Sequence, residues 1–210
     1  MKQINTYINE RLHVTTKSHA YSCQPKTKDE LRKIIIQRIE EDGNECDLND
    51  IDVSKITDMS YMVNTNTKLD LGNEIFKDFN GDISQWDVSN VENMKYMFNQ
   101  CEQFNCDISD WDVSNVKDAE CMLWGCEKFN CDLSKWDVSN VESTECMFWG
   151  CKIFNCDLSH WNVKKVKTMM GMFSHCEKFN QNLDEWDVSN VYEMYHAFYD
   201  CPTKPKWHED

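Results

Sequence analysis

Apolar residues recur along this chain with a period of 25 residues. Between residues 79 and 201 a unit close to F-N-x-D-[IL]-S-x-W-[DN]-V-S-N-V-x-x-M-x-x-M-F-x-x-C occurs five times. Its tryptophans are Trp86, Trp111, Trp136, Trp161 and Trp186. A fixed period of this length predicts stacked units, because one unit cannot bury its apolar side without a neighbour.

Two shorter periods lie within each unit. Ile83, Trp86 and Val88 suit a short strand with alternate residues turned inward. Apolar residues of 91–101 follow at helical spacing, and Ser89 stands where an N-cap belongs. We therefore predict an α/β repeat solenoid, a right-handed leucine-rich-repeat-like coil of short parallel strands and short helices with an N-terminal capping helix.

The segment before the repeats carries the signals of one amphipathic helix. Thr27 and Glu30 fit a capping box, an apolar stripe follows, and Gly43 marks a stop. We expect a helix over about 28–42, within a capping segment at 26–45, to cover the first unit. Residues 1–25 form an N-terminal extension.

An earlier, sixth unit precedes the five regular ones. Residues 46–56 align with residues 131–141, and ten extra residues fall in a polar stretch at about 64–77. The repeat domain is therefore predicted to span 46–201, with an insertion at 64–77 and a tail at 202–210. Such an insertion is most often a tolerated loop, although insertions can also carry function.

The charge of the chain is strongly negative. The formal net charge is −15, and residues 79–201 hold nine lysines and no arginine against 21 acidic residues. Nucleic-acid binding needs clustered basic residues, so direct binding to nucleic acid is not expected. An acidic surface favours a protein partner with a basic surface.

The first residues contain no apolar core of a signal peptide, and no segment approaches a membrane span. We expect a monomer in the cytoplasm, with the cell surface or secretion as the alternative. In a reducing cytosol the twelve cysteines would remain thiols.

The repeated unit resembles that of BspA-like bacterial surface proteins, a family with leucine-rich-repeat-like units of about 26 residues that also occurs in mycoplasmal lipoproteins. The resemblance covers about 46–201. It implies the repeat fold together with roles in adhesion and protein binding, and it supplies no catalytic residues.

One cysteine closes each unit, and three interpretations of this row stay open. Cys101, Cys126, Cys151, Cys176 and Cys201 share the apolar side of the unit, which favours buried thiols. Disulfides between adjacent units are the second interpretation, because stacked units bring Cα atoms within bridging range. Metal binding is the third, but the spacing does not form the paired cysteines of zinc sites.

A row of acidic residues follows the tryptophans. It consists of Asp87, Asp112, Asp137 and Asp187, with Asn162 in the fourth unit. Stacked like charges repel one another, so the D-x-S-N context suggests local Asx-type hydrogen bonds to backbone amides. A strip that binds a basic partner is the alternative, and a hard-cation site is the third possibility.

Positions that vary between units carry the sharpest functional signal. On a helical wheel over 91–101, positions 96 and 99 lie away from the apolar side. These positions hold Tyr96, Cys121, Cys146, Gly171 and His196, and Asn99, Trp124, Trp149, Ser174 and Tyr199. Trp124, Trp149, Cys121 and Cys146 would then be neighbours on an outer face, typical of an interaction hot spot. Alternatively, Gly125 and Gly150 end the helix early and the tryptophans fold back on the next unit.

The fourth unit departs from the others in charge. Lys164 and Lys165 replace the Ser-Asn of the other units, and Lys167 adds a third positive charge nearby. They form either a solvated, charge-balancing face or a spot that binds a partner's carboxylate.

No motif supports catalysis or a cofactor. The six histidines show no triad spacing, and the chain has no metalloprotease motif, phosphate-binding glycine loop or nucleophile elbow. We predict a non-enzymatic protein-binding module or inhibitor of a basic, perhaps nucleic-acid-binding, target, as in phage anti-defence or anti-CRISPR proteins. Partner-binding candidates are Trp124, Trp149, Cys121, Cys146, Tyr96, Tyr199, Asp87, Asp112, Asp137 and Asp187. A surface adhesin and a thiol- or metal-buffering protein are the alternatives.

Overall fold

The structure is a computed structural model that describes residues 21–63 and 75–208. Among these residues the helix α2 (Lys28–Asp42) is the single helix. The Thr27 hydroxyl accepts a hydrogen bond from the Glu30 amide at 3.2 Å, and Gly43 ends the helix with φ +87°. The helix predicted over about 28–42 is therefore confirmed. Its buried face is formed by Leu31, Ile35 and Ile39.

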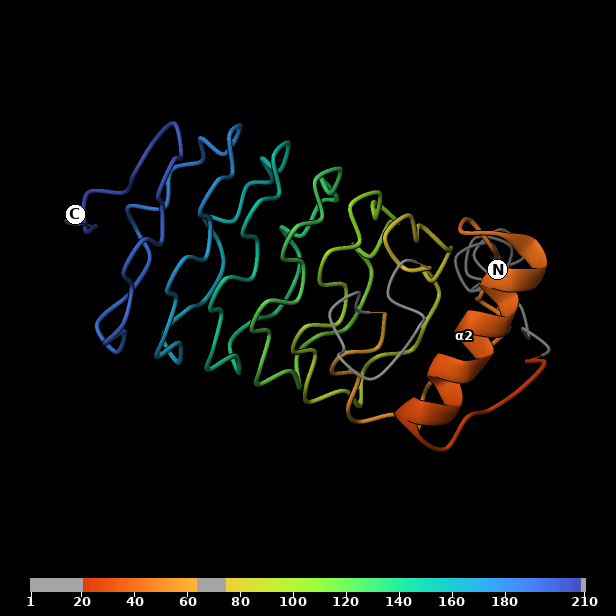
Figure 1. Cartoon of the computed structure of the whole chain (residues 1–210). Coiled ribbons are helices and arrows are strands. Elements are labelled where there is room, and N and C mark those ends of the chain that lie inside the picture. The colour runs from red at the N-terminus through yellow and green to blue at the C-terminus, as the bar shows by residue number, and fades with distance from the viewer. Residues whose placement is uncertain (1–20, 64–74, 209–210) are drawn as a thin grey trace, which may run out of the picture.

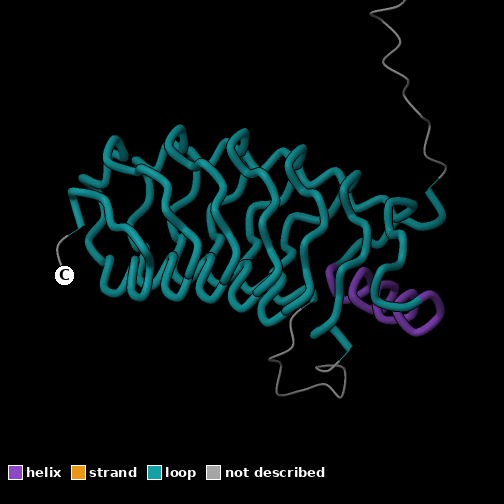
Figure 2. The backbone as a smooth tube through the Cα atoms, turned by 90° about the horizontal axis from the view of Figure 1, so that it is seen from above, coloured by secondary structure: helices purple, strands orange, loops and turns teal. Residues whose placement is uncertain are grey.

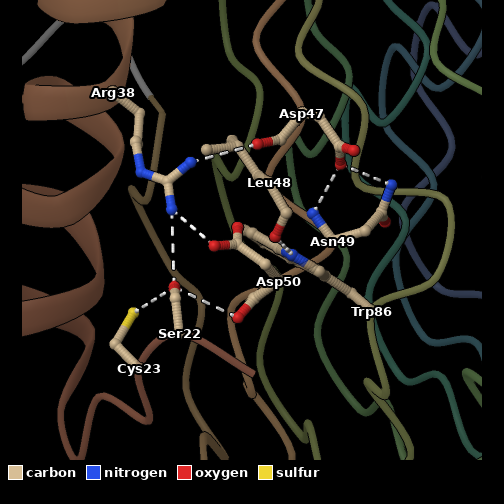
Figure 3. Close-up of polar contacts among 8 residues, drawn as sticks. All are labelled: Ser22, Cys23, Arg38, Asp47, Leu48, Asn49, Asp50 and Trp86. Carbon is tan, nitrogen blue, oxygen red and sulfur yellow. Dashed lines mark hydrogen bonds and ion pairs between the residues drawn. The ribbon is translucent and has the colours of Figure 1, made fainter. Parts of the chain in front are cut away.

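Helix α2 is fixed to the first repeated unit by Arg38 (Figure 3). The Arg38 guanidinium forms an ion pair with Asp50 at 2.5 Å and donates to the Ser22 hydroxyl at 3.4 Å. Partial burial disfavours the Asp50 carboxylate, but hydrogen bonds from Ser22 and Arg38 outweigh that effect and hold the pKa of Asp50 below its ordinary value. The helix is thus anchored through a charged contact as well as through its apolar face.

The 25-residue units, which we call layers, lie side by side along the molecule. Figure 1 shows this succession from α2 at one end to the C-terminus at the other. The layers after the first end at Cys101, Cys126, Cys151, Cys176 and Cys201. In Figure 2 the layers are drawn entirely as loops and turns, with helix only at α2.

The predicted α/β repeat solenoid is wrong. Among the described residues no strand or sheet forms; adjacent layers share only isolated parallel bridges, such as Asn93 with Asp118 and Asp118 with Ser143. No helix forms over residues 91–101, where residues 95–100 are turns. The leucine-rich-repeat-like coil of short strands and short helices expected from the sequence is therefore replaced by stacked turns.

Left-handed backbone conformations explain why the helices are missing. Each layer has a residue of positive φ at the position of Tyr96 (+56°), where later layers have Cys121 (+54°) and Cys146 (+51°). A second residue of positive φ lies four residues later, as at Gln100 (+64°) and Gly150 (+74°). An α-helix of L-residues cannot pass through the left-handed region, so each turn is broken twice.

The same turns still point their apolar residues inward. Val91, Met94, Met97 and Phe98 are all at most 1% exposed. Successive phenylalanines stack, with 5.9 Å between the ring centroids of Phe104 and Phe129. The spacing that imitates a helix is thus the spacing of a buried face.

The tryptophans tie each layer to the one before it. The Trp161 indole N–H donates to the Leu133 carbonyl at 3.0 Å, and each of the other repeat tryptophans bonds in the same way. The cysteines that close the layers do likewise: the Cys151 thiol donates to the Leu123 carbonyl at 3.2 Å. Trp207, in the C-terminal segment, continues the row by donating to Leu183 at 2.7 Å.

Most of the insertion predicted at 64–77 lies outside the described residues, as do most of the N-terminal extension and the last two residues. Within the described residues, no helix has the length and apolar character needed to cross a bilayer.

Candidate functional site

An unbroken row of aromatic rings crosses the last four layers along one line of turns. The ring centroids of Trp124 and Trp149 are 5.6 Å apart, and those of Trp149 and His175 are 5.8 Å apart. His175 lies 5.3 Å from Tyr199, which lies 4.9 Å from His196. Tyr195 completes the row, with its ring 3.7 Å from that of His196. We call these six residues the aromatic stripe.

Two glycines and a left-handed turn position the tryptophans. Gly125 and Gly150 follow Trp124 and Trp149 with φ of +78° and +74°, and their amides donate to the next layer. A Cβ atom at Gly171 would lie 2.8 Å from Cε3 of Trp149, so this ring lies directly over the Gly171 backbone of the next layer. The tryptophans do lie side by side, and Trp149 leans on its neighbouring layer.

Exposure rises along the stripe toward the C-terminus. Trp124 and Trp149 are half-buried, whereas Tyr195 and Tyr199 are 69% and 52% exposed. Exposed aromatic rings next to one another are what a protein-binding surface offers. The stripe therefore has a partly sheltered end and an open end.

A separate aromatic pair lies nearer the N-terminal end. Tyr61 and Tyr96 stack with centroids 4.9 Å apart and planes only 5° from parallel. The Lys95 ammonium lies 5.6 Å from the centre of the Tyr96 ring and pairs with Glu120. Burial and a hydrogen bond with Cys121 raise the pKa of Tyr96 far above its ordinary value, so its hydroxyl stays protonated. Tyr96 thus belongs to this pair and not to the stripe.

Cys121 and Cys146 are not on an outer face, as the helical wheel implied. They are 1% and 6% exposed, because the left-handed backbone at both residues turns their side chains inward. The Cys121 thiol donates a hydrogen bond to the Cys146 sulfur, and this bond and burial raise the pKa of Cys121 well above its ordinary value. Neither thiol can contact a partner in this conformation. Asn99 and Ser174, at the position of the tryptophans, are buried as well.

The acidic row is exposed and locally hydrogen-bonded. Asp112 Oδ1 accepts the Ser114 amide at 3.0 Å, and the corresponding Asx-type bonds occur at Asp87, Asp137 and Asp187. The Ser114 hydroxyl and amide hold the pKa of Asp112 below its ordinary value. The expected Asx bonds are therefore present.

A second acidic group, Glu145, lies in the same turn as Trp149. Glu145 precedes Cys146, whose sulfur would be 3.2 Å from a Cβ at Gly171, the residue under the Trp149 ring. Burial and then the nearby negative charge of Glu120 raise the pKa of Glu145. Among the described residues no ion pair neutralises Glu145. The charge on Glu145 is thus available to a cation from outside.

The lysines of the fourth repeated unit are engaged by neighbouring layers. Lys167 pairs with Glu142, Lys165 donates to Asn140 at 2.7 Å, and Lys164 lies 3.9 Å from Asp187. This arrangement is that of a charge-balanced face.

All twelve cysteines are free thiols in the structure, and no group of three or more metal-ligating side chains gathers within residues 21–63 and 75–208. Burial raises the pKa of Cys106 to about 11 and that of Cys131 to about 12. Their sulfurs accept the backbone amides of Ile83 and Ile108 from the preceding layer. The thiols therefore act as packing and hydrogen-bonding groups.

Sequence reasoning missed His175 and Tyr195. They lie at the positions of Gln100 and Lys95, which a helical wheel does not align with Trp124. A comparison of every variable position between units would have shown aromatic residues gathering in the last two layers.

A family model described as "Mycoplasma protein of unknown function, DUF285" matches residues 36–155 and 130–206. The chain belongs to this family. No curated protein and no solved structure matches it. The match covers the layers and the last part of α2, and it carries no assigned activity.

Proposed function

We propose that this protein is a non-enzymatic protein-binding module whose aromatic stripe takes up a basic segment of its partner. The observation that carries the proposal is the unbroken row of rings from Trp124 to Tyr199, with the unneutralised Glu145 in the same turn as Trp149.

The chemistry of the stripe suits lysine and arginine side chains. A cation over the face of tryptophan or tyrosine gains about 0.5–2 kcal/mol, and more when the site excludes water. Bringing a cation near Glu145 and Glu120 also relieves the repulsion that raises the pKa of Glu145. The exposed acidic row from Asp87 to Asp187 would attract a basic partner at longer range.

An oligoarginine peptide tests this proposal, with an oligoglutamate peptide of the same length as the reference. We expect the protein to bind oligoarginine in a titration followed by tryptophan fluorescence and calorimetry, and to bind more weakly as salt is raised. Replacing both tryptophans, Trp124→Ala with Trp149→Ala, should weaken binding about 30-fold, the scale of an interaction hot spot. Tyr192→Ala is the matched control, since Tyr192 is 76% exposed but lies outside the stripe.

The pH dependence gives a second readout. The raised pKa of Glu145 means that it takes up a proton at higher pH than an ordinary glutamate, so cation binding should weaken as pH falls through that raised value. Glu145→Gln should remove this part of the pH dependence. Equal binding of both peptides, or unchanged binding after loss of both tryptophans, would refute the proposal.

We also propose that the repeated unit is related to that of the BspA-like surface proteins. This proposal rests on the Phe-Asn, Trp and Cys positions of the unit. An inhibitor of a basic protein inside the cell is the role we propose, and a cell-surface adhesin is the alternative that the resemblance implies. Thiol titration in a native lysate separates them: twelve reduced cysteines support the first, and disulfides on a protein exposed at the cell surface support the second.

A further inference from the structure

In the turns of residues 94–100 and their counterparts, the backbone hydrogen bonds between layers run in one direction. The amides of Met94, Tyr96, Phe98 and Gln100 donate to the carbonyls of residues 118, 120, 122 and 124 in the next layer. The corresponding four amides of the next three layers donate in the same way. Each layer therefore has a donor edge toward the C-terminal end and an acceptor edge toward the N-terminal end.

The remaining backbone groups of these turns are used within the layer. The amides of Met97 and Cys101 donate to carbonyls three residues earlier, at Met94 and Phe98. On the donor edge, the Phe98 carbonyl also accepts the Cys126 thiol of the next layer at 3.1 Å. An ordinary edge strand differs, because it presents donors and acceptors alternately.

The last layer leaves this donor edge open. The amides of Met194, His196, Phe198 and Asp200 occupy the donor positions, and no described residue accepts a hydrogen bond from them. The carbonyls of this turn accept bonds from the previous layer or from within the turn, as when Met169 donates to Glu193 and Ala197 to Met194.

The C-terminal segment covers the core of the last layer but not this edge. Trp207 packs on Trp186 and Phe198, with ring centroids 6.4 Å and 5.7 Å away. Beside the donor edge lies a hollow of about 390 Å³ that is lined in part by Met194, Tyr195, His196 and Tyr199. Space for another segment of chain therefore adjoins the four amides.

The opposite end of the molecule is closed. Helix α2 supplies cations to this end: Arg32 donates to the Met62 carbonyl of the acceptor edge at 2.6 Å and to the adjacent Tyr61 carbonyl at 3.1 Å. Lys28 bonds to Asp58 and to the Ser60 hydroxyl. A second copy cannot add its first layer to the open edge, and two donor edges cannot pair with each other.

We propose that the donor edge of Met194, His196, Phe198 and Asp200 binds an extended segment of a different protein. The segment would run parallel to residues 194–200 and present carbonyls at alternate residues over seven positions, as residues 193–199 do for the layer before. Its fourth residue must take a positive φ, which favours glycine, and its second, fifth and sixth residues should be apolar, as in residues 168–174. This surface adjoins the open end of the stripe, but it rests on backbone amides and stands if the proposed function fails.

The test uses a synthetic peptide that copies residues 166–176, with Ser in place of Cys176. We expect the peptide to slow hydrogen exchange at the amides of Met194, His196, Phe198 and Asp200 at least tenfold, measured by NMR on the whole protein. A peptide with D-alanine at the Gly171 position should protect as well. A peptide with valine there should not, because valine disfavours positive φ.

Variants of the protein isolate the backbone donor. Met194→Pro removes an amide that has no partner in the folded chain, and it should lower peptide affinity about tenfold. Met194→Ala keeps the amide and should bind within about twofold of the parent protein, with near-ultraviolet circular dichroism confirming the fold of both. Absence of protection by the peptide would overturn the proposal. Equal protection by an oligoglutamate peptide would also overturn it, because it would show that the four amides attract any anion. Oligoarginine binding is measured separately, so the two proposals fail independently.

Discussion

The position of Gly171 beneath the Trp149 ring makes a quantitative prediction. Gly171→Ala places a methyl group 2.8 Å from Cε3 of Trp149 and 3.2 Å from the Cys146 sulfur, at a residue with φ +61°. The left-handed conformation costs alanine about 1–2 kcal/mol relative to glycine. Lower entropy of the unfolded chain returns about 0.4–1 kcal/mol. Moving the half-buried Trp149 ring should cost about 1–2 kcal/mol more, a typical penalty for overpacking.

Gly150→Ala is the matched control for the collision. Gly150 also has a positive φ, of +74°. An added Cβ there would meet only the Gly125 backbone of the previous layer, at 3.7 Å, which is an ordinary contact. This variant carries the backbone strain without the displaced ring. We expect it to lose about 0.5–1.5 kcal/mol, and Gly171→Ala to lose about 1–2 kcal/mol beyond that.

Urea unfolding followed by circular dichroism gives both free energies of unfolding, and acrylamide quenching of tryptophan fluorescence reports the Trp149 ring. Gly171→Ala should increase quenching, and Gly150→Ala should not. Equal losses of stability in the two variants with equal quenching would show that the ring does not rest on Gly171, and the assembly of the stripe as described would be wrong.

Two further predictions concern the contacts between layers. Trp161→Phe should cost about 2–4 kcal/mol in urea unfolding, because the buried Leu133 carbonyl loses its indole donor and a smaller ring leaves a gap; a loss below 1 kcal/mol would contradict this role for the tryptophan row. Stability should also fall in alkali. Burial raises the pKa of Cys106 from 9.0 to about 11, so its stabilising contribution is complete below pH 9 and disappears as pH rises through the folded value. Cys106→Ser, which keeps an acceptor for the Ile83 amide, should flatten the fall in urea midpoint between pH 8 and pH 11, and an identical fall would count against the thiol as its source.

The sequence was sufficient for features that depend on side-chain chemistry. The period of 25, the buried Phe, Trp and Cys positions, the Thr27-capped helix and the Asx bonds of residues such as Asp112 all follow from residue type and spacing. Each depends on a local preference or on the need to bury apolar surface. Each is therefore visible in the order of residues.

Secondary structure within the layers could not be obtained in this way. Apolar residues at 91, 94, 97, 98 and 101 have the spacing of a helix, but tight turns broken by left-handed residues bring the same positions to one side. Glycine usually signals a positive φ, yet this position is held by tyrosine, cysteine and histidine in most layers, with glycine only at Gly171. The cost of these conformations is met by contacts between layers, which a single unit does not reveal.

The two candidate sites also differ in whether the sequence alone reveals them. Comparing units was enough to find Trp124 and Trp149, because tryptophan is unusual at a variable position. The donor edge has no side-chain signature, since four backbone amides exist in any sequence. It follows from the direction of the bonds in one line of turns. Because the backbone bonds of residues 94–100 and their counterparts all run one way, these turns have two chemically different ends. This chain closes its acceptor end with Lys28 and Arg32 of α2, so its donor end is where another protein chain can add.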